Sequence, residues 1–308
     1  MGRIVRYLLL GTVFIIAGCG GGGLVTRPPG EPAEFSGWFA YCSPSHTLPD
    51  DPIVFPRQPG ASHLHDFFGN QTTNAHSTLS TMLAGRTLCT AAADTAAYWV
   101  PVLYRNGTRV DSDLVVAAYT RSPTLRASTQ YRAPSPDLKV VIGNANATRP
   151  EDNPLLGTRI YWVCFDGGDP RREPPASCTP TDSIFLVIEY PECWNGALDS
   201  ADHRSHLAYP TGDVCPGTHP TAIPRLFTAY LYPVGTPTGA ITLASGNVYS
   251  AHGDFWNTWN QARFEQLTAS CVNAGVDCGF QQDNTTSISR RLDVGRIRRL
   301  IGGTRRGY

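Results

Sequence analysis

Short runs of β-branched and aromatic residues, separated by glycine, proline, asparagine and aspartate, dominate the middle of the chain. Such runs are typical of β-strands, because branched and flat side chains pack well on a pleated surface and the residues between them favour turns. The sequence predicts strands at residues 96–104, 114–119, 138–143, 159–165, 184–190, 226–234 and 240–246.

One later segment has a helical period instead. In residues 254–271 large side chains recur three or four positions apart, which predicts a helix with one apolar face. Asp254 or Asn257 would cap its first turn. Many strands and one late helix predict an all-β fold, a single β-sandwich or jelly-roll-like domain with long loops.

The first residues have the pattern of an export signal. Arg3 and Arg6 precede the apolar run 8–17, which is too short to span a membrane comfortably. The run ends in IAGC at residues 16–19, which resembles the signal of bacterial lipoproteins and implies cleavage before Cys19 and attachment of diacylglycerol to its thiol. An ordinary signal peptide is the alternative. We therefore expect an extracytoplasmic protein at the cell surface, anchored to the membrane by lipid.

Composition divides the chain further. Residues 1–18 are the predicted signal peptide, and residues 19–36 form a tether rich in glycine and proline. Residues 37–279 show no internal repeat and no second linker, so we expect one β-rich domain there. Residues 280–308 contain seven arginines and two aspartates and are interpreted as a basic, flexible tail.

Charge argues against nucleic acid as a partner. The formal net charge of the chain is zero, but the tail contributes +5 and the signal peptide +2, which leaves −7 on the body of the chain. A mildly acidic body does not fit a nucleic-acid binder. We expect a monomer, with an extracellular polysaccharide or cell-wall glycan as its partner besides the membrane.

Eight cysteines follow Cys19, and an even number on the oxidising side of a membrane predicts four disulfides. Sequence alone leaves the connectivity open, although Cys164–Cys178 and Cys271–Cys278 would close short loops. No C-x-x-C pair occurs, which argues against zinc-ribbon and thioredoxin-type sites. The eight residues are Cys42, Cys89, Cys164, Cys178, Cys193, Cys215, Cys271 and Cys278.

The segment SHLHDFFGN at residues 62–70 is the first of three polar clusters. In an extended chain His63 and His65 share one face and Asp66 points to the other. Two imidazoles at this spacing are a familiar metal chelate, because neutral histidine is a common ligand.

The other two clusters lie far along the chain. Residues 193–210 contain a His-x-x-His pair, His203 and His206, whose side chains share one face on a helical turn. Asp202 could orient one of these rings. In residues 250–259, His252 and Asp254 would open the predicted helix, whose N-terminus favours a charged carboxylate.

Six of the eight histidines fall in or near these clusters, so we expect them to converge on one site. The alternative is that they bond loop backbones in a disulfide-tied fold. The candidate catalytic residues are His63, His65, Asp66, His203, His206, His252 and Asp254. The candidate substrate-binding residues are Asn70, Trp194, Asp202 and Trp256. A divalent metal, if one is bound, would take His63, His65 and His206.

Several blocks resemble a known family. The segments DDPIVFPRQPGASHLHDFFGN, TLCTAAADTAAYWVPVLYRNGT, CWNGALDSADHRSHLAYP, CPGTHPTAIPRL and HGDFWNTW occur in the order seen in DUF1996, a family of secreted fungal and actinobacterial proteins. The resemblance covers roughly residues 40–275, and some fungal members also carry WSC carbohydrate-binding modules. It implies no defined activity. Where the family often reads HADF followed by Gly-Trp, this chain has Gly253 and a different continuation, which changes that loop.

Three functions fit these observations. The first is a carbohydrate-active hydrolase or lyase that uses histidine as base or as metal ligand. The second is a non-catalytic module that binds glycan or cell wall. The third is a structural metal-binding domain. No serine-hydrolase elbow, P-loop or dinucleotide fingerprint is present, which excludes those classes.

Overall fold

The computed structural model describes residues 35–284 and 292–302. The predictions for the signal peptide, for Cys19 and for nearly all of the tether lie outside these residues. The described part is mostly strand, with few helices. None of its helices is both long enough and apolar enough to cross a lipid bilayer.

A seven-stranded sheet forms the larger layer. Its order is β10-β9-β11-β15-β7-β1-β18, and every neighbouring pair is antiparallel except the parallel pair of β1 and β18. The central strands are buried on both faces, which explains their continuous apolar sequences. The strands are β1 Gly37–Cys42, β7 Leu114–Thr120, β9 Ile160–Cys164, β10 Gly167–Arg171, β11 Ile184–Glu189, β15 Arg225–Tyr232 and β18 Asp277–Phe280.

A five-stranded antiparallel sheet forms the second layer, in the order β2-β3-β4-β17-β8. Its strands are β2 Pro44–Leu48, β3 His65–Gly69, β4 Ala97–Pro101, β8 Lys139–Gly143 and β17 His252–Trp256. Two small three-stranded sheets complete the fold. They contain β5 Leu103–Arg105, β6 Thr108–Val110 and β16 Ile241–Leu243, and β12 Cys193–Trp194, β13 Leu207–Ala208 and β14 Thr221–Ala222.

The two large sheets pack face to face around one hydrophobic core, so the predicted sandwich is confirmed. Phe68 of β3 meets Tyr230 of β15 with ring centroids 5.2 Å apart. At Gly253 a β-carbon would lie 2.3 Å from Cδ1 of Ile188 in the opposite sheet. The close approach of the layers at this point therefore requires glycine.

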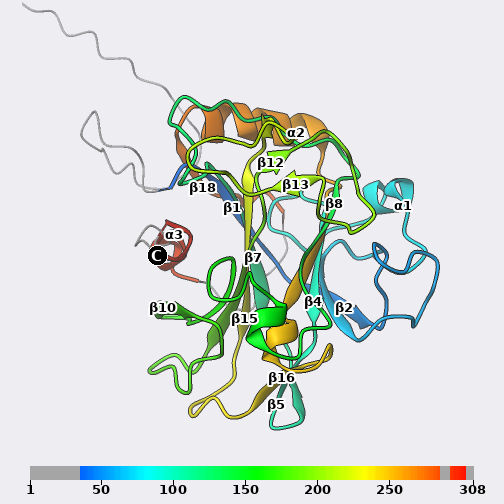
Figure 1. The fold of residues 1–308 in the computed structure, drawn as a ribbon, viewed down its shortest axis with the longest axis vertical. Helices are drawn as coiled ribbons and strands as arrows, with labels where there is room; N and C mark the ends of the chain where they lie inside the picture. The colour runs from blue at the N-terminus through cyan, green and yellow to red at the C-terminus, as the bar shows by residue number, and fades with distance from the viewer. Residues whose placement is uncertain (1–34, 285–291, 303–308) are drawn as a thin grey trace, which may run out of the picture. The chain divides into compact units, whose positions relative to one another are not determined.

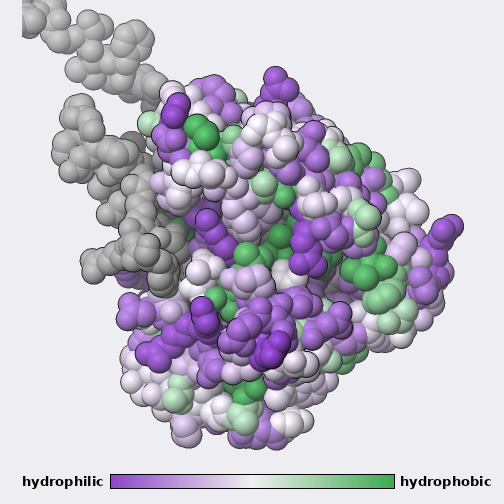
Figure 2. Space-filling model, viewed as in Figure 1, coloured by the Kyte–Doolittle hydropathy of each residue, from purple (hydrophilic) through white to green (hydrophobic). Residues whose placement is uncertain are grey.

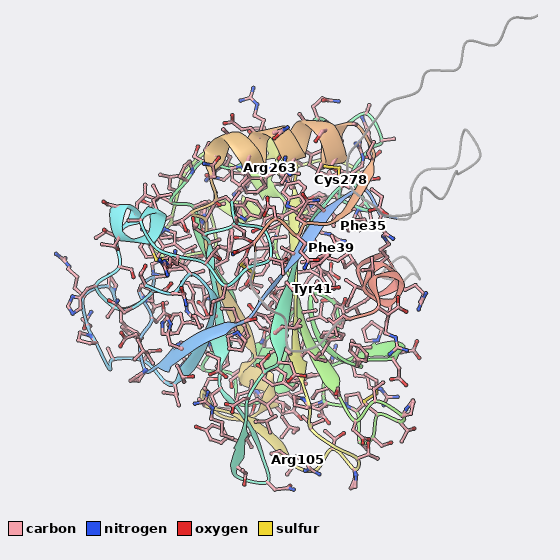
Figure 3. All side chains as sticks on the ribbon, turned by 180° about the vertical axis from the view of Figure 1, so that it is seen from behind. Phe35, Phe39, Tyr41, Arg105, Arg263 and Cys278 are labelled. Atoms are coloured by element: carbon pink, nitrogen blue, oxygen red, sulfur yellow. A yellow bond between two sulfur atoms is a disulfide. The ribbon has the colours of Figure 1, made fainter. Side chains whose placement is uncertain are left out.

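The outer face of the seven-stranded sheet is covered by helix α3, Val294–Gly302, whose Ile297 and Ile301 are buried against it. Figure 1 shows α3 on one side of this sheet and β2, β4 and β8 on the other. Figure 3 labels Phe35, Phe39 and Tyr41, which lie in or just before β1 and belong to the same hydrophobic cluster as Ile297 and Ile301 of α3. Within the segment predicted as a flexible tail, residues 294–302 thus form an amphipathic helix that packs on the sheet, and Phe280 belongs to β18.

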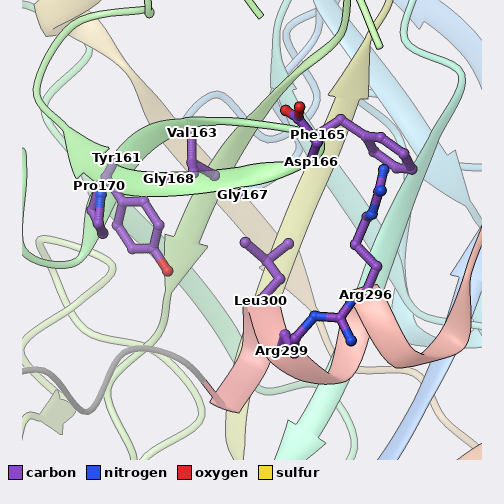
Figure 4. Close-up of a pocket in the computed structure, with 10 residues that line it drawn as sticks. All are labelled: Tyr161, Val163, Phe165, Asp166, Gly167, Gly168, Pro170, Arg296, Arg299 and Leu300. Carbon is purple, nitrogen blue, oxygen red and sulfur yellow. The ribbon is translucent and has the colours of Figure 1, made fainter. Parts of the chain in front are cut away.

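A cavity of about 300 Å³ lies between α3 and the β9–β10 hairpin. Figure 4 shows Leu300 of α3 pointing toward this hairpin and the side chain of Arg296 extending toward Phe165. The guanidinium of Arg296 lies over the ring of Phe165, 4.9 Å from its centroid. The segment resembles a solvated tail in sequence because arginines stand between the apolar residues that pack on the sheet.

The late helix begins further along than predicted. Residues 252–256 form strand β17, and α2 covers Gln261–Leu267 with Asn260 as its N-cap, before a π-helical continuation at Thr268–Asn273. Asp254 therefore lies within a strand and caps nothing, because pairing with β4 and β8 holds this segment extended. The remaining helices are α1 Leu79–Leu83 and two 3₁₀ turns, Pro150–Asp152 and Val248–Ser250.

All eight cysteines of the described chain are paired, which confirms four disulfides. The two short loops expected from sequence are both present. The bonds are Cys42–Cys89, Cys164–Cys178, Cys193–Cys215 and Cys271–Cys278.

Candidate functional site

The outer face of the five-stranded sheet carries a row of histidines. His65 on β3 lies opposite Pro101 of β4, and His252 on β17 lies opposite Gly143 of β8. Alternation along the strands puts His65, His252 and Asp254 on the outer face, together with Trp99 of β4, which pairs with Asp254. Both histidines are almost fully buried, with 0% and 2% of their surface exposed.

Three imidazoles meet at this row. Nε2 of His252 lies 3.1 Å from Nε2 of His63 and 3.3 Å from Nε2 of His65. Nδ1 of His65 lies 2.9 Å from the carbonyl oxygen of Asp50, and Nδ1 of His252 lies 2.8 Å from that of Ser250. Because a carbonyl can only accept, both Nδ1 atoms are donors, and both Nε2 atoms carry lone pairs.

Two lone pairs at 3.3 Å cannot form a hydrogen bond with each other, whereas a cation between them would bind both. Two nitrogens bound tetrahedrally to one Zn²⁺ at 2.0–2.1 Å lie about 3.3–3.4 Å apart. The observed spacing therefore suits a metal ion. The fixed Nδ1 atoms add the outer hydrogen bonds that orient metal-binding histidines.

Burial keeps these rings neutral. It lowers the pKa of His63 to about 4 and the pKa of His252 to about 3. It also lowers the pKa of His65 well below the usual value, and the neighbouring rings lower it further. At neutral pH all three side chains are in the form that binds metals.

Two carboxyl groups lie beside the histidines. Asp254 is completely buried, and neither of its oxygens has a hydrogen-bond partner among the described residues. Its Oδ2 lies 3.9 Å from Nε2 of His252. Asp51, His65 and Asp254 can place ligand atoms within 4.8 Å of one another. Burial raises the pKa of Asp254 well above its usual value, and the charge of Asp51 adds to this.

The loop that supplies His63 is fixed by the side chains of two aspartates. Asp50 accepts hydrogen bonds from the backbone N–H groups of Gly60 and Ala75. Asp51 accepts from the N–H groups of Ile53 and Val54. These bonds, together with the bond from Asp50 O to His65, hold the chain from residue 50 to residue 65 against β3.

A second loop borders the site along β8. Its backbone pairs with the edge of that strand, since Val141 N donates to His203 O. Nη1 of Arg204 donates to the carbonyl of Gly143, the partner of His252, at 3.1 Å. His203 faces Asp199, with Nδ1 and Oδ1 2.9 Å apart. His203 and Arg204 are thus at the rim of the histidine cluster.

Two predicted catalytic residues lie elsewhere. Asp66 points to the other face of β3, where it accepts hydrogen bonds from Thr47 and Arg109. His206 is buried beneath its own loop, with Nδ1 2.9 Å from Oγ of Ser200. The metal-ligand prediction is therefore corrected at one position, since His252 takes the place given to His206.

The four predicted substrate-binding residues all make hydrogen bonds within the chain. Asn70 is buried and bonds the backbone at Met82, Thr95 and Thr72. Asp202 accepts from two backbone N–H groups in a tight turn.

The two tryptophans are buried rather than presented to a ligand. Trp194 donates to the carbonyl of Ala197, and Trp256 donates to Asp137.

Asp51 and Arg204 were missed as neighbours of the site. Asp51 follows Asp50 in the first family block. This acidic pair lies eleven or more residues before the histidine pair, and no periodicity in the sequence indicates that the two pairs are close in space.

The sequence profile of the family described as "Domain of unknown function (DUF1996)" matches residues 51–259, about two thirds of the chain. The chain therefore belongs to this family. The match begins at Asp51 and includes all three histidines of the cluster. No curated protein and no solved structure matches the chain.

Proposed function

We propose that this protein is an extracytoplasmic metalloenzyme, a hydrolase or lyase of extracellular polysaccharide, whose metal ion is bound by His63, His65 and His252. The observation that carries the proposal is the convergence of three Nε2 atoms, two of them held as acceptors by Nδ1–H bonds to carbonyls. Three histidines with a free position are a common donor set of catalytic zinc.

The carboxyl group of Asp254 supports a cation at this position. A buried carboxyl without a hydrogen-bond partner is costly, whereas a nearby cation would compensate its charge. When bound, a divalent ion would polarise a substrate oxygen or lower the pKa of a bound water. His63 is only partly buried, so it is the member of the cluster nearest to solvent.

The polysaccharide part of the proposal rests on the predicted export and on the family resemblance. All six tryptophans are buried, so none is available to stack on a sugar ring. On the face drawn in Figure 2, hydrophobic side chains form small patches among hydrophilic ones. Recognition of a glycan, by an enzyme or by a non-catalytic binding module, would therefore depend on polar and charged groups.

A structural metal site is the second candidate, because His65, His252 and Asp254 are almost completely buried. The two candidates differ in what the metal does. A structural ion would raise stability without turnover. A catalytic ion would be required for cleavage, and it would have an open coordination position at which solvent exchanges.

Metal content is the test. The full chain, purified without chelator and without affinity histidines, is expected to contain about one equivalent of a divalent transition metal. His252→Ala should lose it, whereas His206→Ala should retain it, because His206 is outside the cluster. A wild-type chain that neither contains nor takes up Zn²⁺, Co²⁺, Cu²⁺ or Mn²⁺ would contradict the proposal. Assays on a polysaccharide panel, with and without chelator, then separate catalytic from structural metal.

A further inference from the structure

Arg204 lies at the rim of the histidine cluster with part of its guanidinium unused. Its Nη1 donates to Gly143 O at 3.1 Å, and its Nε donates to Asp202 O at 3.3 Å. Among the described residues, Nη2 makes no hydrogen bond and the side chain makes no ion pair. The residue is exposed to solvent, so these N–H groups are accessible.

Gly143 fixes the position of this guanidinium relative to the cluster. A β-carbon on Gly143 would lie 2.8 Å from Cβ of His252, so the two residues are in immediate contact. By binding the carbonyl of Gly143, Arg204 is held next to the strand segment that carries His252.

Charge at the site favours an anionic ligand. Asp254 and Asp51 lie beside the three neutral histidines, and their carboxylates can balance the charge of a divalent ion. Arg204 adds a further positive charge on the solvent side. A guanidinium with free N–H groups is well suited to carboxylate and phosphate oxygens, which it can bind through two hydrogen bonds.

We infer that Arg204 anchors an oxyanion of the substrate beside the histidine cluster, and that the substrate is an acidic polysaccharide bearing carboxylate groups. This inference rests on the proposed function and specifies its substrate class. It also supplies the recognition that the buried tryptophans cannot provide. Inorganic phosphate has the same oxyanion chemistry, so it serves as a second probe that distinguishes a free anion from a glycan carboxylate.

The experiment uses the full chain loaded with Co²⁺, whose visible spectrum reports on the metal and on nearby anions. Trigalacturonate, neutral galactotriose and inorganic phosphate are titrated separately. The wild type is expected to bind trigalacturonate more tightly than galactotriose. Arg204→Gln should keep its Co²⁺ and lose at least about tenfold in affinity for trigalacturonate, the loss typical of a charge-assisted pair. Arg126→Gln is the matched control, an exposed arginine paired with Asp213, and should bind as the wild type does.

Each other result has a defined meaning. Equal affinity of Arg204→Gln and the wild type for trigalacturonate overturns the inference, as does preference for phosphate over trigalacturonate. If Arg204→Gln fails to hold Co²⁺, Arg204→Lys decides: retained Co²⁺ with weakened trigalacturonate binding supports the anchor, and unchanged binding overturns it. If the wild type takes up no Co²⁺, the proposed function fails, and calorimetric titration of trigalacturonate into the same variants still tests Arg204.

Discussion

The outer faces of the two large sheets are covered by different elements and carry different kinds of side chain. The seven-stranded sheet presents Phe39, Val116 and Val187, and α3 covers them with Ile297 and Ile301. The five-stranded sheet places His65, His252 and Asp254 among Phe67 and Trp99, beneath two hydrogen-bonded loops. The first arrangement stabilises the fold by burying apolar surface. The second buries polar groups at a cost in desolvation, and it is the face on which we propose the functional site.

The largest expected effect concerns the face closed by α3. Ile297→Asp puts a charge into a fully buried apolar contact and should lower the free energy of unfolding by about 4 kcal/mol or more. Metal content should not change, because α3 lies on the other sheet. Denaturant unfolding and metal analysis of the same sample check both statements. Arg299→Ala, an exposed position on the same helix, should stay within about 0.5 kcal/mol of the wild type. A loss of metal in Ile297→Asp under folding conditions would break the comparison.

The interior between the sheets contains a separate polar group that makes stability depend on pH. Burial raises the pKa of Asp94 to about 8, although Tyr98 donates a hydrogen bond to it at 2.9 Å. The folded chain then keeps a proton that the unfolded chain has lost, so stability falls as pH rises from about 4 to about 8.

Asp94→Asn should remove that contribution, which amounts to about 1.4 kcal/mol per pH unit within the interval. Unfolding free energies measured at several pH values between 5 and 8 test this. A wild-type slope that persists unchanged in Asp94→Asn would show that another group is responsible.

Gly253 tests how closely the two sheets approach beneath the histidine row. Gly253→Ala forces shifts of Ile188 Cδ1, 2.3 Å from the added carbon, and of the Tyr190 hydroxyl, 2.9 Å from it. The expected cost is about 1–3 kcal/mol of unfolding free energy. Its side chain points away from the cluster, so loss of stability with retained metal is the expected pair of results. Gly143→Ala is the contrasting variant, because its added carbon meets His252 and should weaken metal binding as well.

The smallest effect checks the start of α2. Asn260 accepts a hydrogen bond from Arg263 N, so Asn260→Ala should lower the unfolding free energy by about 1 kcal/mol. Asn257→Ala is an instructive comparison, because the sequence predicted a cap there and the structure gives it bonds to Pro134 and Ser135 instead. If Asn260→Ala has no effect on stability, this assignment of the helix start is wrong.

The strands could be predicted from sequence because their signal is local. Runs such as residues 114–119 and 184–190 are continuous, apolar and bounded by turn residues, and they appear as β7 and β11 almost to the residue. The segment 252–256 was misjudged because Trp256 and Trp259 extend the helical period backward. Pairing with β4 and β8 overrides that local preference.

The site was accessible only in part. His63 and His65 are a recognisable pair, but the partner histidine lies almost 190 residues away, and sequence gave no means of preferring His252 over His206. The order of the strands makes that choice, because only β4 lies between β3 and β17. Asp51 and Arg204 are placed near the site by loops. Because loops have no periodic sequence pattern, their path could not be predicted.

The most direct test of a metal centre on this face is a crystal structure of the protein as purified, with anomalous data collected across transition-metal absorption edges. The account predicts one anomalous peak about 2.0–2.2 Å from Nε2 of His63, His65 and His252. An ordered map of this region without such a peak, or a peak bound by other residues, would contradict it.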